Sequence, residues 1–138
     1  MALTNDHDVA VTWSAASSLT MNSNTTRYES DSEPIHATAI AATLRVLVDN
    51  AGTPASGDVV DLWISWSVDG TNFDTPEHAM ALGRLDTVAA NDPGEDPAAR
   101  TFRLPINGAQ AFKLVSRAPQ SATRNITISA IYNEQRAS

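Results

Sequence analysis

The stretch from Val60 to Val68 constrains the fold most, because apolar and mostly polar positions alternate through it without interruption. Its apolar positions are Val60, Leu62, Ile64, Trp66 and Val68. A period of two is the signature of a β-strand that buries one face, since successive side chains point to opposite sides. Asp69-Gly70 follows immediately and is a strong β-turn signal. This stretch therefore predicts a strand with one face in the core, and then a hairpin.

Similar alternation recurs along the chain. The even positions from Ile40 to Val48 are apolar, with Leu47 as an exception on the other face, and shorter alternating runs begin at Phe102, Phe112 and Ile126. Thr75-Pro76-Glu77 could cap a short helix, but we favour a strand from His78 to Leu85. Pro105 suggests an edge position for the Phe102 strand. The fold class predicted is all-β: an antiparallel β-sandwich or jelly roll of about seven or eight strands.

The N-terminal quarter of the sequence has a different composition from the rest. Residues 1–33 are rich in Ser, Thr, Asn and Asp, and only Val9, Val11 and Trp13 alternate as a short strand. We therefore predict a polar N-terminal arm over residues 1–33 and a single sandwich domain over 34–138. Within that domain Asp86 to Arg100 is predicted to be a long polar loop, of the kind that is often functional.

Charge and composition limit the partners. The 138 residues include 16 acidic and 9 basic side chains, a net charge of −7, and no cysteine. An acidic surface is repelled by phosphate backbones, so no nucleic-acid partner is expected. No targeting signal is recognised, and no apolar run approaches the roughly 20 residues of a membrane span. We expect synthesis in the cytoplasm and no membrane partner.

Catalytic and metal-binding patterns are not recognised. The sequence has no phosphate-binding glycine loop, no nucleophile elbow and no zinc-protease histidine pair. His7, His36 and His78 lie far apart without ligand spacing. Two acidic stretches offer oxygen atoms, but neither has the six to eight that calcium takes; they are Asp69, Asn72 and Asp74, and Asp92, Glu95 and Asp96. We predict no enzyme activity, no catalytic residues, no cofactor and no metal.

Trp63 stands out because its strand parity places it on the polar face, among Asp61, Ser65 and Ser67. Such an aromatic ring can stack on a sugar or contact another subunit. It can equally be covered by a second layer, such as the N-terminal arm, and the sequence leaves these alternatives open. The candidate interface residues are Trp13, Arg27, Tyr28, Trp63, Asp92, Glu95 and Asp96.

Two resemblances extend this interpretation. The segment WSVDGTNF, from Trp66 to Phe73, resembles a hairpin of discoidin-like (galactose-binding-like) β-sandwiches, and TFRLPINGAQAFKLVSRAP followed by NITISAIY looks like the paired final strands of that family. The resemblance covers about half of the chain and implies the fold more than sugar binding. In the hairpin, Asp69 would accept hydrogen bonds and Gly70 would permit a positive φ. The family's end-to-end disulfide is impossible without cysteine.

In overall character the chain resembles tailed-phage capsid decoration (cement) proteins, which are small, acidic, cysteine-free β domains. This resemblance implies a non-enzymatic virion structural protein, often a homotrimer, on the outer face of a major capsid protein and thus at the capsid surface. No functional residues can be transferred, because no motif defines that group. A phage tail-tube or neck protein and a carbohydrate-binding β-sandwich module are the alternatives.

Overall fold

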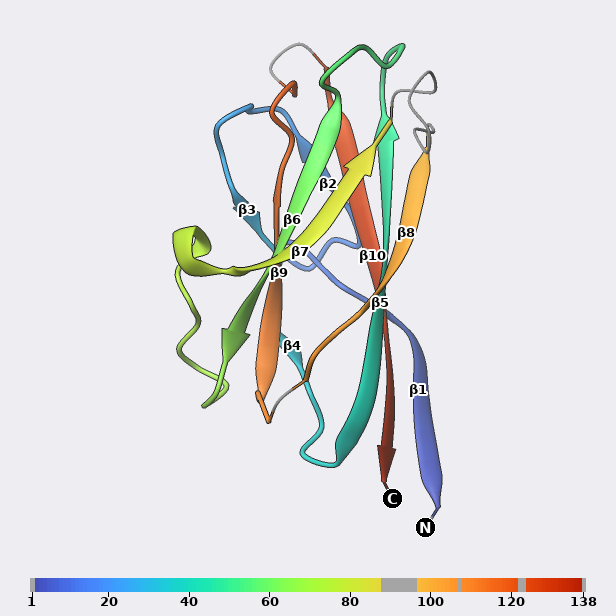
Figure 1. Ribbon diagram of the computed structural model, residues 1–138, viewed down its shortest axis with the longest axis vertical. Helices are drawn as coiled ribbons and strands as arrows, with labels where there is room; N and C mark the ends of the chain where they lie inside the picture. Colours follow the sequence, from blue (N-terminus) through green and yellow to red (C-terminus); the bar gives the residue numbers. More distant parts are fainter. Residues whose placement is uncertain (1, 88–96, 107, 122–123, 138) are drawn as a thin grey trace.

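The computed structural model describes residues 2–87, 97–106, 108–121 and 124–137, which form two antiparallel β-sheets packed face to face (Figure 1). The first sheet has the order β1-β10-β5-β8, with β2 also paired to β10. Its strands are β1 (Leu3–Ala10), β2 (Leu19–Met21), β5 (Ala39–Asn50), β8 (Ala98–Arg103) and β10 (Ile126–Ala137). The all-β sandwich predicted from the sequence is thus confirmed.

The second sheet has the order β3-β9-β6-β7, with β4 also paired to β9. Its strands are β3 (Tyr28–Glu29), β4 (Glu33–Pro34), β6 (Val59–Ser67), β7 (Met80–Asp86) and β9 (Ala111–Arg117). The described residues thus form ten strands rather than seven or eight. The additional strands β2, β3 and β4 have only two or three residues each, which is too short for an alternating pattern to be recognised.

The core lies between the two sheets and is built from the alternating faces of β5, β6, β9 and β10. The inward positions of β5 and β6 are buried as predicted: Ala42, Leu44, Val46, Val48, Val60, Leu62 and Ile64. Of the other predicted members, Trp66 is half-buried against the core, and Ile40 and Val68 are exposed by 52% and 79%. Ile40 is the second residue of β5 and Val68 follows the last residue of β6, so both lie at strand ends.

The Asp69-Gly70 turn forms as predicted, but it opens into a longer connection. Asp69 Oδ1 accepts hydrogen bonds from the backbone N–H groups of Thr71 (2.9 Å) and Asn72 (2.8 Å), and Gly70 has φ +80°. The chain then forms the 3₁₀-helix η1 (Pro76–His78), and β7 begins at Met80 and pairs with β6. The proline therefore begins a short 3₁₀-helix, and the strand predicted from His78 to Leu85 forms from Met80 to Asp86, because His78 belongs to η1.

Residues 1–33, for which we predicted an arm, contribute strands to both sheets. β1 and β2 pair with β10 in the first sheet, and β3 pairs with β9 in the second. Val11, Trp13 and Met21 are buried in the common core. At the other edge of the first sheet, β8 is an edge strand as Pro105 suggested, and β1 and the end of β10 bring both termini to one end of the sandwich (Figure 1).

Candidate functional site

A buried carboxylate lies at the end of the core that is nearest to the termini. The inward face of β10 is apolar from Ile126 to Ala130, continues with Tyr132, and then presents Glu134, which is only 3% exposed. Glu134 has the same strand parity as these core residues, and this is the sequence signal that could have located it. Because a buried charge is costly unless it is paired, its partners define a candidate site.

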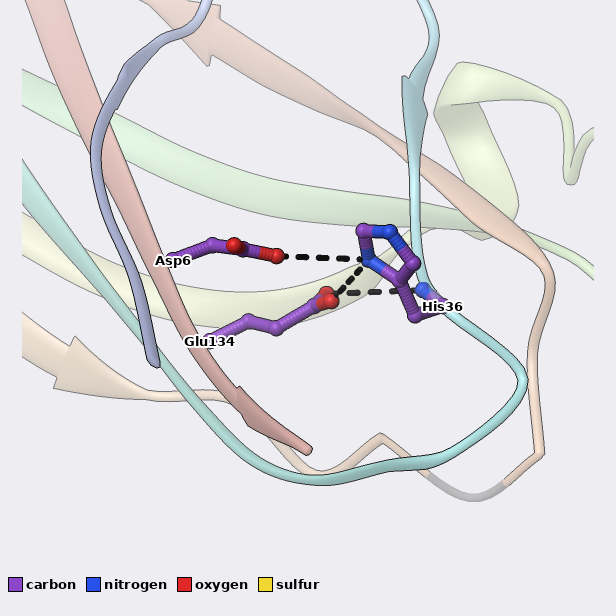
Figure 2. A group of neighbouring side chains, drawn as sticks. All are labelled: Asp6, His36 and Glu134. Carbon is purple, nitrogen blue, oxygen red and sulfur yellow. Dashed lines mark hydrogen bonds and ion pairs between the residues drawn. The ribbon is translucent and has the colours of Figure 1, made fainter. Parts of the chain in front are cut away.

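Three segments converge on Glu134, as Figure 2 shows. Asp6 lies directly opposite it on the neighbouring strand β1. His36 comes from the connection between β4 and β5, and its Nδ1 hydrogen-bonds to Oε1 of Glu134 and lies 3.6 Å from Oδ2 of Asp6. One ligand atom from each side chain lies within 4.8 Å of the others. Residues separated by about a hundred positions in the sequence thus meet in one cluster.

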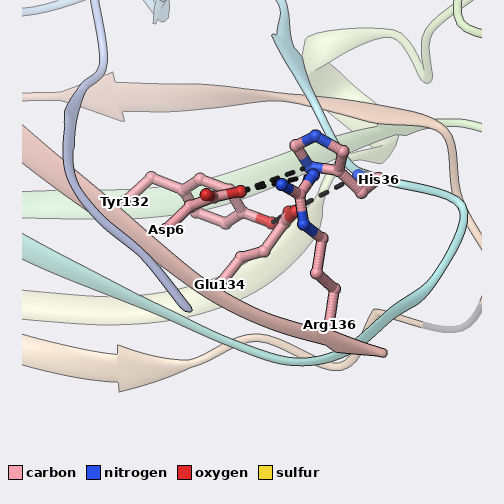
Figure 3. Close-up of polar contacts among 5 residues, drawn as sticks. All are labelled: Asp6, His36, Tyr132, Glu134 and Arg136. Carbon is pink, nitrogen blue, oxygen red and sulfur yellow. Dashed lines mark hydrogen bonds and ion pairs between the residues drawn. The ribbon is translucent and has the colours of Figure 1, made fainter. Parts of the chain in front are cut away.

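Two further side chains hold the carboxylates of this cluster in place (Figure 3). The Tyr132 hydroxyl donates a hydrogen bond of 2.7 Å to Oε2 of Glu134, and the backbone N–H of His36 donates to the same oxygen at 3.4 Å. Arg136, the next inward residue of β10, places Nη1 3.6 Å from Oδ2 of Asp6. We call these five residues, Asp6, His36, Tyr132, Glu134 and Arg136, the Glu134 cluster.

Negative charge dominates the surroundings of the cluster. Burial, and secondarily the charge of Glu134, raises the pKa of the nearby Glu33 carboxyl above its usual range. Burial also raises the pKa of the Tyr132 hydroxyl, and its hydrogen bond to Glu134 adds to this shift. Tyr132 therefore remains a neutral donor at all physiological pH values. The balance of charge at this site favours a cation.

The cluster offers two kinds of chemistry. An imidazole nitrogen and two carboxylate oxygens are the donor atoms that a divalent transition-metal ion takes from proteins. Without a metal, a protonated His36 would form an ion pair with Glu134 and Asp6. The sequence did not reveal the cluster, because the position of His36 beside Asp6 depends on tertiary packing and not on local spacing.

The structure brings two of the sequence-predicted interface residues together on the outer face of the second sheet. The guanidinium carbon of Arg27 lies 4.2 Å from the centre of the Trp63 ring, and that of Arg117 lies 5.7 Å from it. Arg27 Nη1 also donates a 2.7 Å hydrogen bond to the carbonyl of Pro76. Arg27, from the N-terminal segment, thus lies over the Trp63 ring, which is half-buried.

Trp13 and Tyr28, two further predicted interface residues, make other contacts. Trp13 is 4% exposed and belongs to the core, so its indole packs inside the sandwich. Tyr28 is half-buried in β3, and its hydroxyl donates to the side-chain oxygen of Asn22. Asp92, Glu95 and Asp96 lie outside the described residues.

The carboxylates of the acidic stretch at residues 69–74 accept hydrogen bonds from within their own turn. Both side-chain oxygens of Asp69 accept hydrogen bonds from Asn72, and these bonds hold the pKa of Asp69 well below its usual range. Asp74 Oδ2 accepts from the backbone N–H of Trp66 at 3.4 Å. The carboxylates there stabilise the turn between β6 and η1.

The outward face of β10, the central strand of the first sheet, carries no charged side chain. The outward residues of this strand are half-buried and uncharged: Thr127, Ser129, Ile131, Asn133 and Gln135. At the end near the termini this face contains a shallow depression of about 270 Å³, between β1, β10 and β5. On the same side of the sheet, the neighbouring strand β5 carries the exposed charged residues Arg45 and Asp49, which pair with Ile131 and Thr127 of β10. We call the surface formed by these outward residues of β10 the β10 face.

No known protein-family model matches the sequence, and a search of curated proteins finds no significant match. Within the described residues, no helix has the length and apolar character needed to cross a membrane.

Proposed function

We propose that this chain is a non-enzymatic virion structural protein, a capsid decoration protein that binds the outer face of a major capsid protein and stabilises the shell. The observation that carries the proposal is the β10 face. Five consecutive outward positions of β10 carry no charge, and the exposed charges of Arg45 and Asp49 lie beside them on β5. Depletion of charge is the compositional mark of the centre of a protein–protein interface.

The geometry of the first sheet supports the same function. β10 is flanked on both sides by paired strands, so the β10 face rests on a hydrogen-bonded sheet rather than on loops. Ile131, at the middle of β10, provides an apolar side chain, and Leu47 of β5 provides another on the same face. A pre-formed rigid surface loses little conformational entropy on binding, which favours affinity.

Binding of the protein would stabilise the assembled shell through thermodynamic linkage. A protein that binds only where capsid subunits are joined adds its binding free energy to the closed shell and not to the free subunits. The excess of 16 acidic over 9 basic residues suits a position outside the shell, away from packaged DNA.

The edges of the first sheet favour a homo-oligomer, and we propose a trimer. β1 and β8 are edge strands, and the free backbone groups of an edge strand pair readily with another chain. The same feature favours the alternative of a tail-tube or neck protein, in which sheets continue from subunit to subunit around a ring. The carbohydrate-binding alternative has less support, because Trp13 is buried and Arg27 lies over Trp63.

The proposal is tested by mixing the purified chain with empty mature capsids of the phage that encodes it and measuring co-sedimentation. Ile131→Glu places a charge in the centre of the β10 face, and Val68→Glu is the matched control on an exposed residue outside that face. We expect at least a tenfold loss of bound protein for the first variant and none for the second. Circular dichroism would verify that both variants are folded.

Absolute mass from light scattering would distinguish the alternatives. A trimer supports decoration, and a ring of six or more subunits supports a tube. If the wild-type chain never sediments with capsids, the decoration proposal is wrong.

A further inference from the structure

We propose that Asp6, His36 and Glu134 bind one divalent transition-metal ion, with zinc as the best fit. The sequence predicted no metal, because His36 has no ligand at the usual spacing. The fold supplies the missing ligands from β1 and β10 instead. This inference concerns the inward residues of β10 rather than its outward residues, and it does not depend on the proposed function.

The donor atoms are suitably placed. Zinc binds imidazole nitrogen and carboxylate oxygen at about 2.0–2.2 Å, so neighbouring ligands of a tetrahedral site lie about 3.3 Å apart. His36 Nδ1 and Asp6 Oδ2 are 3.6 Å apart, and all three ligand atoms lie within 4.8 Å of one another. Small side-chain rotations would therefore admit an ion between them, with His36 bound through Nδ1 as a neutral imidazole.

The ligands are also held by outer contacts of the kind that support metal sites. Tyr132 donates to Oε2 of Glu134, which leaves Oε1 on the side of His36. Arg136 lies beside the carboxylate of Asp6. Such partners fix the orientation of metal ligands, and their loss commonly reduces metal affinity by about 10–100-fold.

The types and number of donor atoms determine which metal ions the cluster favours. Calcium takes six to eight oxygen atoms and magnesium an octahedral set, whereas this cluster offers two carboxylates and one imidazole. Imidazole nitrogen favours zinc and neighbouring transition metals. Glu134 is buried while the His36 side chain is 52% exposed, so an ion can enter from solvent on the His36 side. A bound ion would join β1, the β4–β5 connection and β10.

The test uses the full-length chain, stripped of metal with EDTA and dialysed. Isothermal titration with ZnCl₂ is expected to give one site per chain, and zinc is expected to raise Tm, an effect that EDTA reverses. MgCl₂ and CaCl₂ at equal concentration should leave Tm unchanged. Cobalt(II) should give the intense visible absorption of a tetrahedral site.

His36→Ala is the decisive variant, because this exposed residue can be changed without opening the core. We expect at least a tenfold weaker zinc affinity for His36→Ala and for Glu134→Gln. His78→Ala is the matched control, since His78 is exposed in η1 and lies outside the cluster, and its affinity should equal that of the wild type. The proposal is overturned if zinc gives neither heat nor a Tm change, or if His36→Ala and His78→Ala bind zinc equally well.

Discussion

Gly83 in β7 faces Phe102 in β8. Replacing Gly83 with alanine tests how tightly the two sheets pack against each other at this edge. A Cβ atom at Gly83 would lie 2.6 Å from Cε1 and 3.2 Å from Cζ of Phe102. The φ of Gly83 is not in the left-handed region, so the cost of Gly83→Ala is steric rather than conformational. The ring has little freedom to retreat, because Phe102 is buried and the Arg100 guanidinium lies 4.8 Å from its centre.

The expected magnitude follows from two opposing effects. Overpacking a core by one methyl group costs about 1–3 kcal/mol. Replacing glycine with alanine also lowers the conformational entropy of the unfolded chain, which stabilises the folded state by about 0.4–1 kcal/mol. The net loss in the free energy of unfolding should thus be about 1–2 kcal/mol. With an unfolding entropy of about 2.1 cal/mol/K per residue, this corresponds to a Tm lower by about 3–7 °C for a chain of 138 residues.

The assay is urea denaturation of a double-mutant cycle with Phe102→Leu. Leucine has no atoms at the positions of Cε1 and Cζ, so it removes the two contacts that make alanine costly at Gly83. The double variant should be less destabilised than the sum of the single variants by about 1 kcal/mol. Additivity within about 0.5 kcal/mol would show that the two side chains do not interact, and would refute the reasoning.

Four further predictions concern other parts of the fold. Backbone and hydroxyl donors lower the pKa of Asp31 below its usual 3.8. Ionised Asp31 therefore stabilises the folded state above about pH 4, and this stabilisation is lost as the pH falls through the lower folded-state pKa. The free energy of unfolding of Asp31→Asn should accordingly depend less on pH in acid denaturation than that of the wild type. Arg27→Ala should expose Trp63, increase its quenching by acrylamide and cost about 0.5–1 kcal/mol by thermal denaturation. Asp58→Ala removes the carboxylate that accepts hydrogen bonds from the Asn50 side-chain amide and the Ala55 backbone N–H and that forms an ion pair with Arg124, and it should cost about 2–4 kcal/mol in urea titrations, with Asp58→Asn intermediate. Asp8 has φ +58°, so Asp8→Val should cost about 1–2 kcal/mol whereas Asp8→Gly should be tolerated, as compared by Tm.

The long strands were predictable because their alternation is a local property. β5 and β6 carry their inward pattern within nine to twelve residues, and the Asp69-Gly70 turn follows from conformational preference alone. The strands of residues 1–33 were not predictable in the same way. Edge strands such as β1 are held largely by backbone hydrogen bonds, which any side chain permits, so a polar composition there does not distinguish a strand from an arm.

The Glu134 cluster shows where local reasoning about a site must fail. Val9 pairs with Tyr132 and Asp6 pairs with Glu134, which requires an extra residue in β1 between them. This bulge contains Asp8, whose backbone N–H donates to the side-chain oxygen of Asn133. With strict alternation from Val9, Asp6 would point to the outer face, because shifting the register by one residue reverses every side chain. The position of Asp6 opposite Glu134 therefore depends on one left-handed residue two positions away, and this dependence makes β1 the determinant of the proposed metal site.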